Sequence, residues 1–334
     1  MKQHARALVG IVASALLLWW ALHDVSAAEV LRELRRADPL LFLLAVVVTT
    51  LGFLIRALRW GVLLLPAAGP VALRPRFAAT TIGFAANNLL PARLGEIARA
   101  LSLGKLADVP VSTVLGSLVV ERLLDALVLV GLLFASMAAP GFPQLQTIGG
   151  VDARHAAAVV AAGTLVVGAL LLTLAAAPAM SLRIAERVLP QRFRVRGVAV
   201  LGSFAAGLGA LGNLRLLLIS LAWALAQWLF LALSFLLAFR AFGIDHVPFS
   251  GAVFLQSLIA LAVAVPSAPG FFGPFEAAAK LGLALWDVPA GQAVSFAIGF
   301  HLGGFIPVTL IGMYYVSRGG LSWRTIGSQA APAR

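Results

Sequence analysis

The chain contains no cysteine among its 334 residues. Disulfide bridges, thiol chemistry and cysteine-ligated iron–sulfur clusters are therefore excluded. Its five histidines are scattered, and they form no spacing that is typical of metal ligands. We therefore expect no metal and no cofactor.

Charged residues are also scarce. They make up 11% of the chain, whereas 61% of it is hydrophobic and the mean hydropathy is +0.99. About a quarter of a typical soluble domain is charged, so this composition excludes a soluble protein. No stretch of ordinary composition is long enough for a soluble catalytic domain. The composition predicts a membrane protein with several spans.

Acidic residues are the rarer of the two charge types. There are 13 of them against 25 lysines and arginines, which gives a net charge of +12. The arginine clusters flank apolar runs, which is typical of cytoplasmic loops beside anionic lipid headgroups. We expect such headgroups as partners at the cytoplasmic face of the plasma (inner) membrane, and no nucleic acid.

Six apolar runs are candidates for crossing a bilayer, which takes about 20 residues. The first 28 residues also fit a signal peptide, but we favour an uncleaved span because the run is long for a signal sequence. Residues 24–38 predict an amphipathic helix at the interface. The six expected spans are 7–23, 39–62, 110–137, 155–177, 214–240 and 290–316.

Two further apolar segments are interrupted by proline and glycine and then reach a glutamate. The first, 77–106, is interrupted at Pro91, and the second, 250–286, between Pro266 and Pro274. Irregular backbone is tolerated at membrane depth only where it is buried in protein or lines water. We expect two re-entrant helical hairpins, although the segments can also be counted as full spans, giving eight spans in total.

The arginine distribution sets the orientation, because cytoplasmic loops are enriched in basic residues. Both termini, residues 56–76 and the basic and amphipathic linker 178–212 are expected on the cytoplasmic side. All loops fit only if the first hairpin opens to the cytoplasm and the second opens to the outside.

The expected fold is therefore a single all-α transmembrane domain, 1–334, with an inverted repeat. The first unit covers 39–137 and the second covers 214–316. A short sequence echo supports the repeat, because Arg56-Ala57-Leu58 and Arg240-Ala241-Phe242 both lie near the predicted end of a span.

Polar residues surround the first interruption. If a half-helix starts after the proline, three-residue steps bring Arg93, Glu96 and Arg99 within side-chain reach. This group fits a self-neutralising ion pair, and it also fits an anion site, since helix amides and arginine forks suit phosphate. We favour a substrate role for Arg93. Asn87 and Asn88 join the candidate site, or they satisfy backbone groups freed by the break.

Three charged residues, Glu121, Arg122 and Asp125, lie near the middle of an expected span and on one helical face. Charges facing lipid would be very costly, so they must face the interior of the bundle. Two interpretations remain open: an ion network that fixes this span to a hairpin, and coupling to protons or substrate. Arg59 and Arg240 are expected to extend to the interface.

Glu276 follows a helix-initiating proline at the second interruption, where the helix dipole favours its carboxylate. Lys280 is one turn further on and is a candidate ion-pair partner. Glu276 fits a helix cap and, equally, a titratable gate across from Arg93. His301 fits a hydrogen-bonded interior histidine better than a proton relay.

These motifs together resemble the flippase-like transmembrane domain of lysylphosphatidylglycerol synthases, a family that includes stand-alone membrane proteins of UPF0104 type. The resemblance covers roughly 7–317 and implies translocation of lipid between leaflets. Full-length synthases carry a soluble aminoacyl-transferase domain as well, which these 334 residues lack, so synthase activity is not expected. The residues that carry it are Pro91-x-Arg93-x-Gly95-Glu96-x-x-Arg99, Glu121-Arg122-x-x-Asp125 and Pro269-Gly270…Gly273…Glu276.

We expect a lipid flippase or transporter, and not an enzyme, that moves an anionic or phosphate-bearing (glyco)lipid. One alternative is a membrane-embedded lipid-modifying transferase, which would need a positioned acid, base or nucleophile. Another is a non-transporting subunit of a lipid-pathway complex. Expected partners are the lipid and either a second copy of the chain or lipid-pathway enzymes. The candidate substrate-binding residues are Arg93, Glu96, Arg99, Glu121, Arg122, Asp125, Glu276, Asn87 and Asn88.

Overall fold

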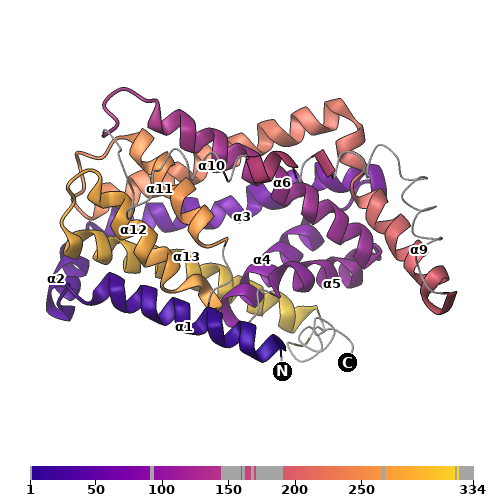
Figure 1. Cartoon of the computed structure of the whole chain (residues 1–334), viewed down its shortest axis with the longest axis horizontal. Coiled ribbons are helices and arrows are strands. Elements are labelled where there is room, and N and C mark those ends of the chain that lie inside the picture. The colour runs from indigo at the N-terminus through magenta and orange to yellow at the C-terminus, as the bar shows by residue number, and fades with distance from the viewer. Residues whose placement is uncertain are drawn as a thin grey trace.

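The computed structural model describes residues 2–90, 94–143, 159, 162–166, 169–170, 191–264, 268–319 and 322. Within these residues every regular element is a helix (Figure 1). In the part of the chain that the structure describes, three helices are long and apolar enough to cross a bilayer, and the bent pair α1–α2 adds a fourth candidate. The predicted all-helical class is confirmed.

The first two helices meet at a bend of 75°. Ser26 is the N-cap of the second helix: its side chain accepts a hydrogen bond from the Glu29 amide, which has no partner within the helix. This second helix buries none of its residues, as expected for an amphipathic helix over 24–38. Their bounds are α1, Lys2–Leu22, and α2, Ala27–Arg36.

Three long helices form the frame of the bundle. The side chains of Asp38 and Asn213 accept hydrogen bonds from first-turn amides and fix the starts of two of them. Those two, α3 and α10, pack along each other. The third, α13, packs on α3 and α4. The bounds are α3, Pro39–Ala68, α10, Leu214–Ala241, and α13, Ala290–Arg318.

Pairs of shorter helices occupy the two segments that the sequence predicts to be broken. The first pair, α4–α5, lies in the right half of Figure 1, and the second, α11–α12, lies in the left half. Gly270 and Gly273 have φ values of 72° and 95°, which glycine adopts at little cost, and they turn the chain into α12. The bounds are α4, Leu73–Leu89, α5, Gly95–Ala107, α11, Phe249–Ala262, the 3-10 helix η3, Pro269–Phe271, and α12, Pro274–Ala284.

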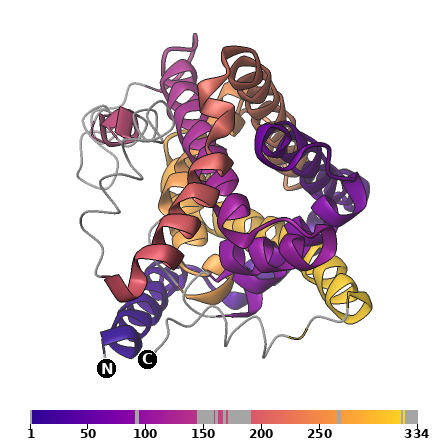
Figure 2. The same ribbon diagram turned by 90° about the vertical axis from the view of Figure 1, so that its right-hand side faces the viewer.

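α6, Val111–Met137, has the length of a spanning helix, but every 18-residue stretch of it contains three charged residues. It packs on both hairpin pairs through α5 and α11. α9, Gln191–Gly207, lies beside α6 and crosses the end of the bundle nearest the viewer in Figure 2, and η2, Gly209–Gly212, follows it. Of the predicted span 155–177 the structure describes residues 159, 162–166 and 169–170, and residues 178–190 of the linker lie outside the described residues.

An aromatic cluster joins α10 to α13 in the core. The ring centroids of Phe235 and Phe300 are 4.5 Å apart, and those of Phe239 and Phe296 are 5.0 Å apart. A second cluster around Trp60 joins α3 to α5 and α6. These two clusters hold the helices that carry the buried polar groups described next.

Candidate functional site

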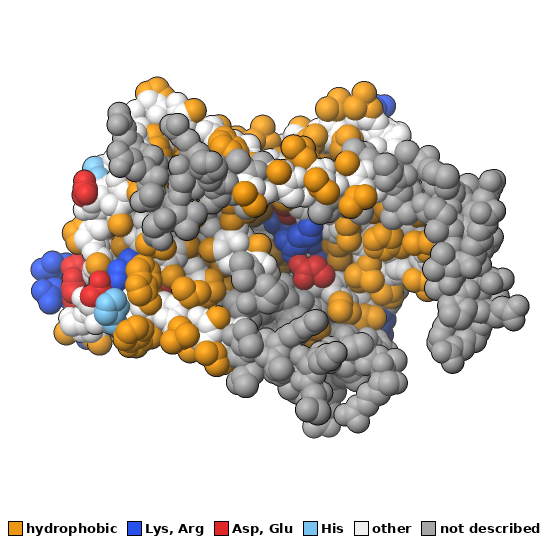
Figure 3. Space-filling model, in the orientation of Figure 1, with side chains coloured by type: hydrophobic (Ala, Val, Ile, Leu, Met, Phe, Trp, Pro, Cys, Tyr) orange, Lys and Arg blue, Asp and Glu red, His pale blue; other side chains and the backbone are white. Residues whose placement is uncertain are grey.

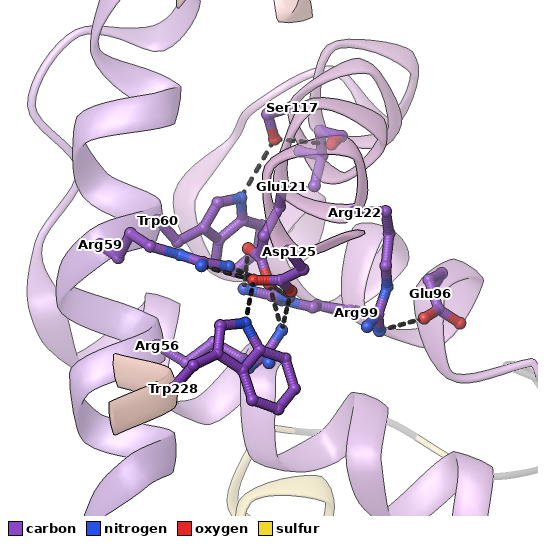
Figure 4. A network of polar contacts seen from close by, with 11 residues as sticks. Arg56, Arg59, Trp60, Glu96, Arg99, Ser117, Glu121, Arg122, Asp125 and Trp228 are labelled. Atoms are coloured by element: carbon purple, nitrogen blue, oxygen red, sulfur yellow. Dashed lines mark hydrogen bonds and ion pairs between the residues drawn. The ribbon is translucent and has the colours of Figure 1, made fainter. Parts of the chain in front are cut away.

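The interior holds a network of arginines and carboxylates (Figure 4). Arg56 and Arg59 on α3 and Arg99 on α5 converge on Glu121 and Asp125 of α6. Arg56 Nη1 lies 2.7 Å from Glu121 Oε1 and 3.1 Å from Asp125 Oδ2, and Arg59 Nη1 lies 2.6 Å from Asp125 Oδ1. Arg99 donates two hydrogen bonds of 2.9 Å to Glu121. The network therefore ties three helices together.

All five side chains are buried, with at most 6% of any of them exposed. Charges removed from water need partners in place, because an uncompensated buried charge is costly. Trp228 on α10 supplies one more, donating a hydrogen bond of 3.0 Å to Asp125 Oδ1. The ring centre of Trp60 lies 3.9 Å from the Arg99 guanidinium carbon, a cation–π contact. Of the two interpretations of the α6 charges, the ion network that links α6 to α5 in the first broken segment is therefore present in the structure.

Arg59 does not extend to an interface. Its side chain has no exposed surface, and α3 continues through Ala68 rather than ending near residue 62. The prediction for Arg59 is wrong because the longer helix moves it from the end of the span into the bundle. Arg240 does lie in the last turn of α10, with 36% of its side chain exposed and Asp245 beside it.

The network carries an excess of positive charge, since three arginines face two carboxylates. The Nε atoms of Arg59 and Arg99 have no hydrogen-bond acceptor in the described part of the chain, and Arg59 Nη2 has only an ion-pair contact, 3.4 Å from Glu121 Oε1. Buried donors without partners are uncommon in native structures. The group can therefore accommodate further negative charge.

A cavity of about 250 Å³ lies beside this network, and Arg56 is part of its wall. Helices from both halves of the chain border it, including α3 and α4 from the first and α10, α11 and α13 from the second. Its other polar lining groups include Asn88, Gln256 and His301, and Gln256 Oε1 has no hydrogen-bond partner among the described residues. Most of the remaining wall is aromatic or aliphatic, for example Phe53, Phe84, Phe271, Phe275 and Phe305. A mainly apolar pocket with a few polar groups is the usual form of a ligand site.

Glu96, in the first turn of α5, forms an ion pair with Arg122 of α6. The expected pairing of Glu96 with Arg99 is wrong, because Arg99 points to Glu121 instead. The Glu96 and Arg122 side chains keep 34% and 46% of their surface exposed. Figure 3 shows a small group of acidic and basic side chains near the centre of the face, with hydrophobic side chains above and to the right of it, and a second group of charged side chains at the left edge. Arg122 thus belongs to a half-exposed pair rather than to the buried network.

The two asparagines before the first break have different roles. Asn87 Oδ1 accepts a hydrogen bond of 2.8 Å from the Gly95 amide at the start of α5, as expected for a residue that satisfies freed backbone groups. Asn88 instead donates to Thr309 Oγ1 of α13 at 2.8 Å and borders the cavity. Arg93, the favoured phosphate ligand, lies outside the described residues, so its distance from Glu276 is not defined.

Glu276 caps α12, and one of its oxygens accepts a hydrogen bond of 2.7 Å from the Gly273 amide. Its other oxygen lies 2.6 Å from His301 Nδ1 on α13, and His301 Nε2 lies 2.8 Å from the Gly270 carbonyl oxygen. The cap and the hydrogen-bonded interior histidine expected from the sequence are both present. Their direct contact with each other is not foreseen by the sequence pattern.

The expected Glu276–Lys280 ion pair is wrong. Lys280 Nζ pairs with Asp24 at the end of α1 and donates a hydrogen bond of 3.1 Å to the Ala21 carbonyl. That pairing lowers the pKa of Asp24 below its usual value, mainly through the hydrogen bond from Lys280. Lys280 therefore fastens the N-terminal helix to α12.

A short sequence is repeated before α6 and α13. Asp108-Val109-Pro110 precedes the first and Asp287-Val288-Pro289 precedes the second. Both aspartates have a φ of 54°, which is uncommon for a residue other than glycine, and both prolines are helix N-caps. The similar segments at Arg56 and Arg240, by contrast, do not occupy equivalent positions, because Arg56 lies within α3 and Arg240 lies at the end of α10.

The same glutamate contact recurs in both halves. Arg122 and His301 each follow their Asp-Val-Pro aspartate by 14 positions. Each contacts a glutamate in the first turn of the preceding helix, Glu96 for Arg122 and Glu276 for His301. An arginine stands in one half where a histidine stands in the other.

Residues 7–312 match the family described as the lysylphosphatidylglycerol synthase TM region. The chain belongs to this family. Two UPF0104 membrane proteins of Methanothermobacter thermautotrophicus are similar to it, one at 26% identity over 91% of this chain and 89% of its own length. The other is 30% identical over 35% of this chain and 34% of its own length. No solved structure matches.

Membership of the lysylphosphatidylglycerol synthase TM-region family makes the protein a membrane protein, and the family name links this domain to lipid metabolism. Membership does not assign roles to residues. Sequence reasoning missed Arg56 as a network member and Trp228 as a donor to Asp125. Two arginines one turn apart in an apolar run are a usable signal for buried partners, whereas nothing around Trp228 marks it.

Proposed function

We propose that the protein moves an anionic or phosphate-bearing lipid between membrane leaflets. The observation that carries the proposal is a positively charged buried network bordering a cavity to which both halves of the chain contribute. The excess charge suits a phosphate-bearing headgroup, since arginines bind phosphate well. The apolar and aromatic wall suits the adjoining acyl or prenyl chain.

We further propose that two inverted units enclose the cavity, 39–137 and 214–316. The helix packing supports this, because exchanging the units preserves the neighbours. α4 packs on α13 as α11 packs on α6, α3 on α4 as α10 on α11, and α5 on α6 as α12 on α13. The repeated Asp-Val-Pro segments support it as well. Inverted units of this kind can open a central site to one side and then to the other.

In this proposal α4–α5 and α11–α12 are re-entrant hairpins that enter from opposite sides. The termini and the basic linker 178–212 face the cytoplasm, and the membrane is the plasma membrane, where arginine-rich loops contact anionic headgroups. Four of the nine candidate residues have a role in this proposal. Asn88 borders the cavity and faces the lipid. Glu121 and Asp125 orient Arg56 toward the cavity. Arg93 remains a proposed phosphate ligand.

Leaflet exchange of labelled lipid in liposomes tests the proposal. The purified full-length chain is reconstituted, and exchange of a fluorescent anionic phospholipid is followed with a membrane-impermeant quencher. We expect exchange well above that of protein-free liposomes. Ala260→Phe adds bulk to the wall of the cavity and is expected to reduce the rate at least about tenfold, since a blocked site does not bind.

Ala135→Phe is the matched control, because Ala135 is exposed on α6 and does not border the cavity. It should exchange lipid at the wild-type rate. The absence of exchange with every phospholipid and polyprenyl-phosphate lipid would overturn the proposed function. Equal rates for wild type and Ala260→Phe would overturn only the assignment of the cavity.

A further inference from the structure

The contact between Glu276 and His301 constrains where a proton resides. His301 Nε2 faces the Gly270 carbonyl oxygen at 2.8 Å, and a carbonyl only accepts hydrogen bonds, so Nε2 carries a hydrogen. On the other side His301 Nδ1 and Glu276 Oε1 are 2.6 Å apart. One further proton must lie between these two atoms, either as an imidazolium beside a carboxylate or as a neutral imidazole beside a carboxylic acid.

Loss of that proton breaks one of the two hydrogen bonds whichever tautomer remains. If Nε2 keeps its hydrogen, the lone pair of Nδ1 faces the Glu276 carboxylate across 2.6 Å, with no donor between. If the hydrogen moves to Nδ1, the lone pair of Nε2 faces the Gly270 carbonyl instead. Glu276 is 1% exposed and His301 is 8% exposed, so water does not readily replace the lost contact.

These hydrogen bonds hold η3 and the start of α12 against α13. Gly270 belongs to η3, and Glu276 also caps α12 through the Gly273 amide at 2.7 Å. The rings of Phe272 and Phe275 lie 4.6 Å and 4.3 Å from the His301 ring. Phe275 and His301 both border the cavity. A change in protonation at this pair therefore acts on one wall of the cavity.

The equivalent contact in the first half lacks this property. There Glu96 pairs with Arg122, whose guanidinium stays charged at any physiological pH. Histidine is the side chain whose unperturbed charge changes in the physiological range. The contact in the first half thus keeps its charge, whereas the same contact in the second half is made by a histidine, which can gain or lose a proton.

Other charged groups around the pair have partners of their own. Lys280 on α12 is held by Asp24, and Arg56 on the opposite cavity wall is held by Glu121 and Asp125. Arg76 of α4 donates to the Ala57 and Leu58 carbonyls, and Glu29 of α2 lies against the Gly291 end of α13. Within the described residues no second acid or base contacts the Glu276–His301 pair.

We propose that Glu276 and His301 form a proton-binding site that controls lipid movement by holding or releasing η3 and the start of α12. Resting on the proposed function, this makes protons the coupling ion. With the proton bound, η3 and α12 are fastened to α13. When the proton passes to solvent, one hydrogen bond is lost and this wall of the cavity is released.

Hydrogen exchange read by mass spectrometry tests the site without any transport. The full-length chain in nanodiscs is compared from about pH 5 to about pH 9, a range that spans histidine titration, with rates corrected for intrinsic exchange. We expect protection of the peptide over residues 268–276 to fall about five- to tenfold as pH rises, which corresponds to the loss of one buried hydrogen bond.

Glu276→Gln separates this proposal from a general effect of pH. A glutamine amide donates to His301 Nδ1 while its oxygen accepts from Gly273, so it reproduces the protonated contact and does not titrate. Protection in this variant should stay high at all pH values. His246→Gln is the matched control, because His246 Nε2 also contacts a backbone carbonyl, that of Trp286 at 2.8 Å, but does not border the cavity. It should follow the wild type.

Protection that is flat in the wild type, or that falls equally in Glu276→Gln, would overturn the proton site. Leaflet exchange of the same proteins then separates the two proposals. If no lipid moves at any pH while the protection data hold, the proton site stands and the proposed function fails. If lipid moves with a pH dependence that Glu276→Gln leaves unchanged, transport stands and the coupling is overturned.

Discussion

Glu121 is the carboxylate that contacts all three buried arginines of the network. Arg56, Arg59 and Arg99 all lie within 3.4 Å of its oxygens, and its side chain is 1% exposed. In apolar surroundings the cost of a buried charge depends on the sum of its neighbours rather than on any single pair. Removing this carboxylate raises the excess positive charge of the network, whereas removing an arginine reduces it.

This charge count predicts an order of stabilities. Glu121→Gln leaves three arginines facing one carboxylate, and we expect it to cost about 3–5 kcal/mol, the usual cost of breaking a buried pair. Arg59→Met leaves two arginines facing two carboxylates and should cost less. Thermal melting of the purified variants in one detergent gives the comparison. An Arg59→Met protein that melts at or below Glu121→Gln would contradict the excess charge.

The candidate residues predicted from the sequence include Arg99, Glu121 and Asp125 of this network but neither Arg56 nor Arg59. Charges in the middle of an apolar run must face the interior, so the placement of Glu121 and Asp125 follows from the cost of exposing them to lipid. Their partners on α3 could not be derived, because Arg56 and Arg59 stand 62 or more positions away along the chain and their place in the sequence predicts a helix end. Local spacing predicts contacts within one helix, such as Glu96 with Arg99, whereas the fold provided contacts between helices.

At the scale of elements, α6 and α9 approach each other through glycine. A Cβ on Gly116 would lie 2.3 Å from the Phe204 carbonyl oxygen, and one on Gly207 would lie 2.2 Å from that of Thr113. Small residues allow membrane helices to pack backbone against backbone. This close contact fixes α6, which carries Glu121, against α9, a helix of the linker 178–212.

Gly116→Val should therefore separate α6 from α9. We expect a loss of about 1–3 kcal/mol of stability, as for other overpacked interiors, and a lower melting temperature. Gly131→Val is the matched control on the same helix, because a Cβ on Gly131 meets nothing within 4 Å. A melting temperature equal to that of Gly131→Val would show that the close contact does not form.

Helix positions were largely accessible from the sequence. Proline and glycine marked both breaks, and apolar length marked the long helices, since these depend on local backbone chemistry and burial. Helix ends were less predictable from the sequence, because α3 continues through Pro66 to Ala68, beyond its predicted end. The error placed Arg59 at an interface and made the Arg56 and Arg240 segments look equivalent, whereas the repeated Asp-Val-Pro segments at Asp108 and Asp287 have matching φ values.

At the scale of the whole molecule, the proposed transport requires one cavity between two units inserted in opposite directions. The turns at Asp108 and Asp287 end the first and second hairpins, and both residues are exposed. If the units are inverted, the arginine distribution assigns Asp108 to the cytoplasmic side and Asp287 to the outer side.

Single-cysteine labelling tests the inverted arrangement most directly, because the natural chain has no cysteine and each variant carries one thiol. Asp108→Cys and Asp287→Cys are matched, since both positions have a φ of 54°. In sealed right-side-out vesicles, a membrane-impermeant maleimide should label Asp287→Cys and spare Asp108→Cys, with the reverse in inside-out vesicles. Labelling of both positions from the same side would contradict the inverted arrangement and the transport cycle built on it.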